Sequence, residues 1–106
     1  MEKTLNSKRY EFVCQMLRDA RLAVGLTQID LAAKLQIHQT EVSRVERGIR
    51  RLDLLETHDW LNALDIPLLE FLVALDGGLF AMRLRNRTDG PDQLASSARE
   101  PRRKEI

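Results

Sequence analysis

The stretch LTQIDLAAKLQIHQTEVSRVERG, residues 26–48, constrains the fold more than any other part of the chain. It contains two short helical patterns, 28–35 and 39–47, which are separated by only about three residues. Thr27 is a suitable N-cap for the first helix, and Gly48 can end the second helix in a left-handed conformation. Two short helices joined by so brief a turn must cross steeply and share one core. The stretch therefore predicts a helix-turn-helix unit.

Three further helices are predicted around this unit. Apolar residues recur at helical spacing over 8–24, and Gly25 follows as a stop. Asp53 is a suitable N-cap for a helix over 54–64, and a proline suits the first turn of a helix over about 67–75. Every element predicted up to this point is helical and short. The predicted fold class is therefore all-α, with five short helices.

The pattern changes after the glycine pair at 77–78. Apolar and polar residues alternate over 79–85, a period of two that is typical of a strand. A single strand needs a partner edge, so we expect either a short strand or a dimerisation segment over 77–85. Residues 86–106 are rich in charged residues, Asn, Gly, Pro and Ser, which predicts a disordered tail. The helix-turn-helix domain is expected to span 5–76.

Charge is distributed unevenly along the chain, although the net charge is only +1. Residues 1–51 carry +4, residues 52–78 carry −6 and residues 79–106 carry +3. A basic segment beside an acidic one is typical of a protein that meets a polyanion with one face. Such blocks also occur as ordinary solvated surfaces, so charge alone leaves both interpretations open.

The outer side of the helix over 39–47 carries the side chains with the most specific chemistry. A rotation of about 100° per residue turns Val42 and Val45 inward. The outward set is Gln39, Thr40, Ser43, Arg44 and Arg47. Gln can form a bidentate pair with adenine, and Arg with guanine, in a major groove that is wide enough to admit a helix. A polar face on one helix is usually just solvated, but the short turn and the basic charge favour a helix that reads double-stranded DNA.

Other residues are expected to hold the sugar-phosphate backbone. Gln28 lies in the first turn of its helix beside Thr27, where its amide and free backbone N–H groups can bind a phosphate oxygen. Arg47, Arg50 and Arg51 bracket the loop after the second helix and are expected to bind phosphates. A dimer that neutralises about six phosphates would give a slope of roughly −5 for log K against log salt concentration.

Residues 17–72 resemble the helix-turn-helix domain of the Cro/repressor (Xre-like) transcriptional regulators. The matching segments are GLTQIDLAAKL at 25–35, QTEVSRVERG at 39–48 and RRLDLLE at 50–56. The resemblance implies a compact five-helix bundle of the lambda-repressor-like type. It also implies that the chain binds operator DNA, usually as a dimer.

The resemblance assigns roles to individual residues. Carried over by position, it implies that Gln28 contacts the DNA backbone, and that Arg21 and Glu46 form an internal ion pair. The residues that it assigns to base and phosphate reading are Gln39, Thr40, Ser43 and Arg44. Two positions depart from the family pattern. Gln36 stands where many members have Gly, which costs about 1 kcal/mol if the backbone is left-handed there, and His38 replaces a Ser or Thr cap, which weakens the cap.

The helix over 67–75 predicts self-association, because Glu70 is its one polar residue between 68 and 75. A surface helix of a monomer buries one apolar stripe and not its whole circumference, so a second copy is the simplest cover. The residues expected to take part in dimerisation are Leu68, Phe71, Leu72, Leu75, Phe80 and Met82. The alternative is a monomer whose C-terminal segment folds over this helix. A homodimer would match an inverted-repeat operator with half-sites about ten base pairs apart.

No residue pattern indicates catalysis or a bound group. His38 and His58 have no cysteine partner at zinc spacing, and Cys14 is most simply a small buried hydrophobe. The longest apolar run is too short to span a bilayer. We therefore expect no enzyme activity, metal, cofactor, small-molecule substrate or membrane association. A single cysteine suits a reducing compartment, and a cytoplasmic location is expected.

Together these patterns predict a cytoplasmic DNA-binding regulator, a dimeric repressor that reads an inverted-repeat operator. Two alternatives remain open. The chain could be the antitoxin of a toxin–antitoxin pair, in which the segment from Leu79 holds the toxin as a protein partner. It could instead be a protein-binding adaptor that has the same fold without the DNA.

Overall fold

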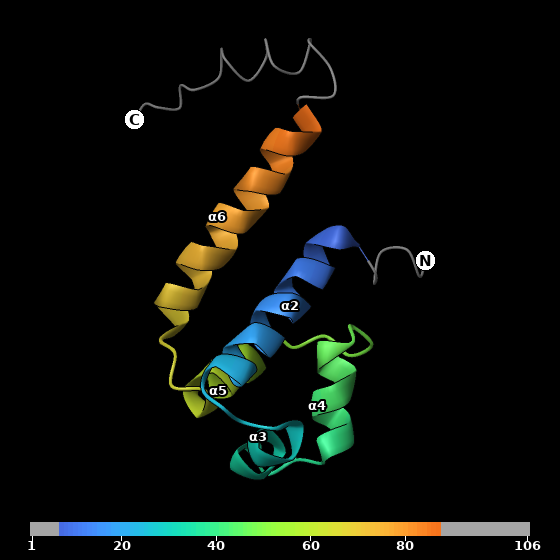
Figure 1. Ribbon diagram of the computed structural model, residues 1–106, viewed down its shortest axis with the longest axis vertical. Helices are drawn as coiled ribbons and strands as arrows, with labels where there is room; N and C mark the ends of the chain where they lie inside the picture. Colours follow the sequence, from blue (N-terminus) through green and yellow to red (C-terminus); the bar gives the residue numbers. More distant parts are fainter. Residues whose placement is uncertain (1–6, 88–106) are drawn as a thin grey trace. The chain divides into compact units, whose positions relative to one another are not determined.

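The computed structural model describes residues 7–87, and this range contains five helices and no strand (Figure 1). The helices are α2 (Lys8–Ala23), α3 (Gln28–Leu35), α4 (Gln39–Glu46), α5 (Leu54–Ala63) and α6 (Leu68–Arg87). The all-α prediction is confirmed. Observed and predicted ends of the first four helices differ by at most one residue.

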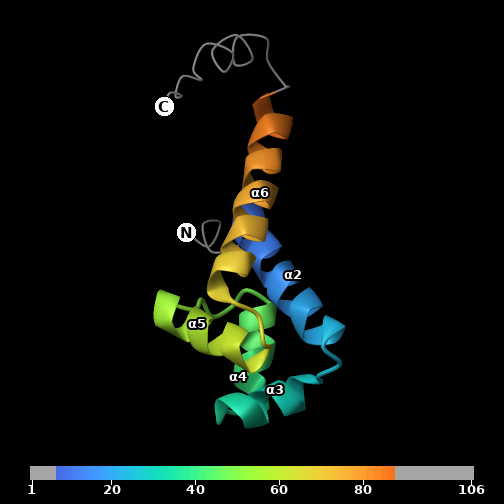
Figure 2. The same cartoon turned by 90° about the vertical axis from the view of Figure 1, so that its left-hand side faces the viewer.

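The chain divides into two compact units, residues 1–75 and 76–106, and the described part of each is considered by itself. The first unit holds α2 to α5 and the first two turns of α6. Within it, α4 packs against α3 and α2, and α5 packs against α3. Figures 1 and 2 both show α3 and α4 side by side, joined by the short turn that the sequence predicts.

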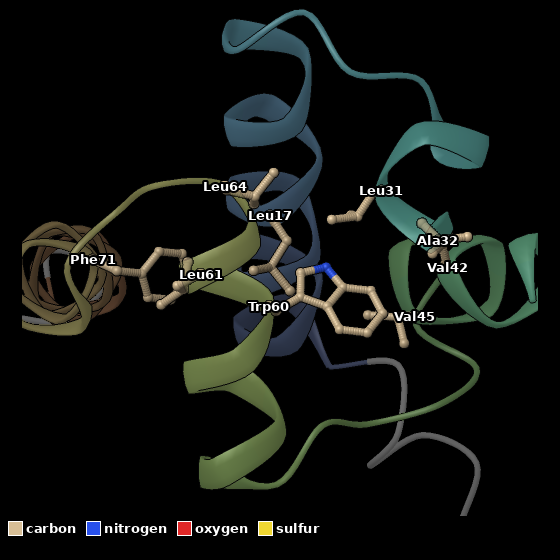
Figure 3. Close-up of a cluster of buried hydrophobic side chains, with 9 residues drawn as sticks. All are labelled: Leu17, Leu31, Ala32, Val42, Val45, Trp60, Leu61, Leu64 and Phe71. Atoms are coloured by element: carbon tan, nitrogen blue, oxygen red, sulfur yellow. The ribbon is translucent and has the colours of Figure 1, made fainter. Parts of the chain in front are cut away.

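Apolar side chains from every helix of the first unit point into one core (Figure 3). Its buried members are Leu17, Leu31, Ala32, Val42, Val45, Trp60, Leu61, Leu64 and Phe71. The two valines of α4 are fully buried, with 0% of their surface exposed. They fix the rotation of α4 about its axis, so the opposite side of this helix faces solvent. Because the core fixes this rotation, it also determines which side chains α4 presents.

The helix ends follow the residues expected to cap them. The Thr27 hydroxyl accepts the Asp30 N–H (3.0 Å), and the Asp30 carboxylate accepts the Thr27 N–H (2.9 Å). Asp53 and Glu56 form the same reciprocal arrangement at the start of α5. Backbone N–H donation to the ionised carboxylate lowers the pKa of Asp30 and of Glu56. His38 makes no such bond at the start of α4, in line with the weaker cap expected there.

The prediction of a strand over 79–85 is wrong, because α6 continues without a break to Arg87. The glycine pair at 77–78 was expected to end the helix. Each glycine disfavours a helix by only about 1 kcal/mol relative to alanine, and the flanking Leu, Ala, Met and Arg residues favour it. The period-two alternation was therefore misleading. In the predicted tail, 86–106, Asn86 and Arg87 end α6 and the rest lies outside the described residues.

Gln36, at the turn between α3 and α4, has a left-handed backbone with φ 61° and ψ 43°. A residue with a Cβ is strained in this conformation by roughly 1–2 kcal/mol, whereas glycine loses about 0.5–1 kcal/mol through its freer unfolded chain. Gln36→Gly is expected to raise the free energy of unfolding by about 0.5–1 kcal/mol, since the side chain is exposed. Urea denaturation measures the change. Gln36→Ala keeps the Cβ and is the control; equal stability of the two variants would contradict the prediction.

Candidate nucleic-acid interface

The solvent side of α4 carries the polar set that the sequence predicts. Gln39, Thr40, Arg44 and Arg47 are exposed, and Ser43 is partly buried. Within residues 7–87, no group hydrogen-bonds the guanidinium of Arg44. The side chains named as readers of DNA therefore lie on one exposed surface of the first unit, with the buried valines behind them.

Two glutamines from neighbouring helices are bonded to each other on this surface. Gln39 Nε2 donates to Gln28 Oε1 at 2.8 Å, and Gln28 Nε2 donates to Glu46 Oε1 at 3.0 Å. Because Glu46 can only accept when ionised, the Gln28 amide must turn its nitrogen toward it and its oxygen toward Gln39. Both amide orientations are thus fixed. Gln39 keeps its own Oε1 and one N–H for a further partner.

This pair of glutamines rests on an ion pair in the interior. Arg21 Nε donates to Glu46 Oε2 at 2.7 Å, and Arg21 Nη2 donates to Glu46 Oε1 at 2.9 Å. Only 8% of the Arg21 side chain and 2% of the Glu46 side chain are exposed. Arg21 Nη1 also donates to the Leu26 carbonyl at 2.9 Å, and the bond to Glu46 raises the pKa of Arg21. The two residues paired by the family resemblance are thus bonded here.

The three arginines expected to bind phosphates have different surroundings. Arg47 Nε donates to the Ser43 hydroxyl at 3.1 Å on the exposed side of α4. Arg50 Nη2 donates to Glu56 Oε2 at 2.7 Å, which raises the pKa of Arg50. This arginine also lines a groove of about 620 Å³ with residues of α3 and α5. Arg51 stacks on the ring of Tyr10, with its guanidinium carbon 4.3 Å from the ring centre.

The hydroxyls of Thr27 and Ser43, both predicted to contact DNA, already accept hydrogen bonds within the protein. Thr27 uses its oxygen as the acceptor that caps α3, and Ser43 uses its oxygen to accept from Arg47. Each hydroxyl still has its own proton to donate. Both side chains can therefore give a hydrogen bond to a DNA oxygen without losing the contact that positions them.

The residues expected to take part in dimerisation differ in how deeply they are buried within the chain. Phe71 is 5% exposed and belongs to the core, and Leu68 and Leu75 are partly buried against it. Leu72 and Phe80 are exposed, and Met82 is partly buried. Exposed apolar residues of α6 that the prediction omitted are Leu69 and Val73 in the first unit and Leu84 in the second. Their omission follows from the sequence, since a helix apolar on all sides does not reveal which side meets the core.

Two partners of the predicted arginines, Tyr10 and Glu56, were not identified from the sequence. Glu56 could have been found, because it stands three residues after the cap Asp53, the spacing of a capping box. Tyr10 could not have been found in this way. Its contact with Arg51 joins residues 41 positions apart, and no local pattern signals such a pair.

Across residues 7–87, no three His, Cys, Asp or Glu side chains gather where they could hold a metal ion. No helix in this range is long and apolar enough to cross a membrane. Burial raises the pKa of the Cys14 thiol, which lowers the fraction of reactive thiolate at neutral pH.

Comparison with known proteins gives matches to the fold and to its helix-turn-helix. The helix-turn-helix family model matches residues 17–71. The wild-type restriction-modification controller protein C.Esp1396I aligns with a TM-score of 0.65 and 27% identity, covering 71% of this chain and 99% of that chain. An XRE-family like protein from Pseudomonas syringae pv. tomato str. DC3000 aligns with a TM-score of 0.64 and 36% identity, covering 72% of this chain and 93% of that one. No curated protein sequence matches the chain.

Proposed function

Because the chain belongs to the Cro/C1-type (Xre-like) family of helix-turn-helix transcriptional regulators, we propose that it represses transcription by binding an inverted-repeat operator as a dimer. The observation that carries this proposal is the division of α4 into two sides. Val42 and Val45 are fully buried, while Thr40 and Arg44 on the opposite side are exposed. A short helix held from behind in this way can enter the major groove of duplex DNA.

Gln39 and Arg44 are proposed to read bases. The fixed amide of Gln39 offers one acceptor and one donor, which complement the N6 amino group and N7 of adenine. Arg44 carries the planar donor pair that matches O6 and N7 of guanine. Gln28 acts through Gln39, because it holds the amide of Gln39 in one orientation through the bond at 2.8 Å.

Phosphate contacts are proposed for Gln28 at the start of α3, and for Arg47 and Arg51 beyond the reading residues. Ser43 holds the guanidinium of Arg47 on the outer side of α4. Arg50 is bound to Glu56, so we assign it a contribution through its charge and not a direct contact. This assignment divides the contacts into those that position the protein and those that read sequence.

The dimer is proposed to form through α6. Leu69, Leu72 and Val73 in its first turns are 73%, 39% and 65% exposed, and they are spaced as neighbours on one helix face. Leu69→Glu combined with Val73→Glu is expected to give a monomer at tens of micromolar, as measured by sedimentation. Operator affinity should fall by about 10²–10⁴, because the second half-site contact is lost.

A matched control for this pair of substitutions is Leu22→Glu, which places a carboxylate on another exposed leucine, at the end of α2. It should leave both the dimer and the operator affinity unchanged. If the double variant stays dimeric, the dimer does not form through this part of α6. Equal loss of affinity in the Leu22→Glu protein would show a general charge effect.

The experiment that tests the function is selection of bound sequences from random duplexes. Enriched sequences are expected to be inverted repeats with half-site centres about ten base pairs apart, with two chains bound per duplex. A reporter whose promoter carries the selected site should be repressed when the chain is expressed. The absence of any enriched sequence, together with affinity insensitive to salt, would instead indicate the protein-binding adaptor.

The structural neighbours support the proposal that this domain can control an operator. The aligned part of this chain corresponds to 99% of the restriction-modification controller C.Esp1396I. A domain of this size is thus proposed to be sufficient for operator control. An antitoxin role would require a bound protein that is lost when the segment from Leu79 is deleted while DNA binding persists.

A further inference from the structure

We infer that Tyr10, a residue of α2 outside the helix-turn-helix, positions Arg51 for a phosphate contact. This inference rests on the proposed function and extends it to a residue that makes no contact with DNA itself. Tyr10 acts through the loop that follows the recognition helix α4. Its ring stacks on the side chain of Arg51, and its hydroxyl bonds the backbone carbonyl of Arg50.

The side-chain contact is a cation–π stack. The guanidinium carbon of Arg51 lies 4.3 Å from the centre of the Tyr10 ring, well inside the range of about 6 Å in which such a pair attracts. Stacking engages the face of the guanidinium, whereas its N–H donors lie in its plane. Arg51 is exposed although it is stacked. The stack therefore restricts the rotamer of Arg51, and the ring does not cover the plane of its N–H donors.

Backbone contacts fix the rest of the loop against the same ring. The Tyr10 hydroxyl donates to the Arg50 carbonyl at 3.4 Å. Gly48 is buried with φ +81°, and a Cβ there would lie 4.0 Å from the Tyr10 ring and 3.7 Å from Cys14 Sγ. The Ile49 N–H donates to the Arg44 carbonyl at 2.9 Å, which ties the loop to α4. The loop is thus held between the recognition helix and Tyr10.

Burial gives this support a constant protonation state. Tyr10 is partly buried, and desolvation raises the pKa of its hydroxyl. The hydroxyl therefore stays a donor to the Arg50 carbonyl throughout the neutral range. Arginine otherwise has a flexible side chain whose ordering opposes binding. A guanidinium that is already ordered by the ring avoids most of that loss when the duplex arrives.

The test is a double-mutant cycle on the operator obtained by selection. Arg51→Ala should reduce the magnitude of the salt slope by about 0.9 per subunit, or about 1.8 in a dimer. Tyr10→Leu should weaken binding by about 5- to 30-fold, the effect of two exposed cation–π contacts. In the Arg51→Ala background, Tyr10→Leu should cost no more affinity than Tyr10→Phe, which loses only the hydroxyl bond to the Arg50 carbonyl. Tyr10→Phe keeps the ring and should bind within about two-fold of the unaltered protein.

Two further variants make the cycle decisive. Phe12→Leu removes a ring elsewhere on α2 and should leave binding and salt slope unchanged. Arg51→Lys keeps the charge without the planar stack, so it should retain the slope and lose affinity. It changes an exposed residue, so it provides a test even if Tyr10→Leu does not fold, as judged by thermal unfolding.

Additive losses from Tyr10→Leu and Arg51→Ala would overturn the inference, as would an unchanged slope in Arg51→Ala or full affinity in Arg51→Lys. These outcomes leave the proposed function intact, provided that the unaltered protein binds its operator. If the unaltered protein selects no duplex, the proposed function fails first.

Discussion

Replacing Glu46 with alanine is expected to lower the free energy of unfolding by about 3–5 kcal/mol, the cost of breaking a buried ion pair from one side. The variant leaves the Arg21 guanidinium, whose side chain is only 8% exposed, without its carboxylate. Gln28 Nε2 loses its acceptor at the same time. Small domains are stable by roughly 5–15 kcal/mol, so a loss of this size removes a large share of the total. Chemical denaturation followed by circular dichroism measures it.

The matched control replaces both partners, as Arg21→Met with Glu46→Leu. Removing a buried pair together and filling its space with apolar groups is often neutral or stabilising. The double variant should therefore recover most of the lost stability. It should still bind the operator more weakly than the unaltered protein, because Gln28 no longer has the carboxylate that orients it. A single variant that unfolds at the same denaturant concentration as the unaltered protein would show that the pair is not buried as described.

Replacing Arg44 with alanine is expected to weaken operator binding by about 1–3 kcal/mol per half-site, or about 2–6 kcal/mol in a dimer. The loss corresponds to a factor between about 30 and 20,000 in dissociation constant. The guanidinium is exposed on the reading side of α4, so its removal should leave the fold unchanged. Selection from random duplexes should show lost discrimination at one base pair of each half-site. Titration against the selected operator measures the affinity.

The control for Arg44→Ala is Lys34→Ala, which removes the same charge from an exposed residue of α3 that lines the groove near α5. It should change affinity only slightly and leave the selected sequence unaltered. If both variants lose affinity equally and both still select the same bases, Arg44 acts through its charge alone. The proposed base contact would then be wrong.

The parts of the fold that the sequence predicts well are those with strong local signals. Thr27 and Asp53 are residues that favour the N-cap, and they begin α3 and α5 as expected. The inward rotation of α4 followed from two valines three residues apart, which both prove fully buried. Local capping and helical spacing are enough to determine these features, because they depend on residues within one or two turns.

The features that could not be predicted depend on contacts between distant residues or on small energy differences. No sequence pattern shows that Arg50 bonds Glu56 or that Arg51 stacks on Tyr10. Arginine reaches far and accepts several kinds of partner, so its choice depends on the folded neighbours. Helix α6 continues through Gly77 because the helix preference of the neighbouring residues outweighs a cost of about 1 kcal/mol per glycine. No single residue reveals this balance.

The carboxylate of Glu46 serves two neighbours at once, since it accepts from Arg21 in the interior and from Gln28 at the surface. Changes to Gln28 or Gln39 during evolution are therefore restrained by the requirements of the interior. Thr40 and Arg44 are not linked to the interior through Glu46 in this way. New operator preferences should therefore arise first at these two positions. A library that randomises this pair and leaves the glutamines in place is thus the economical route to a retargeted repressor.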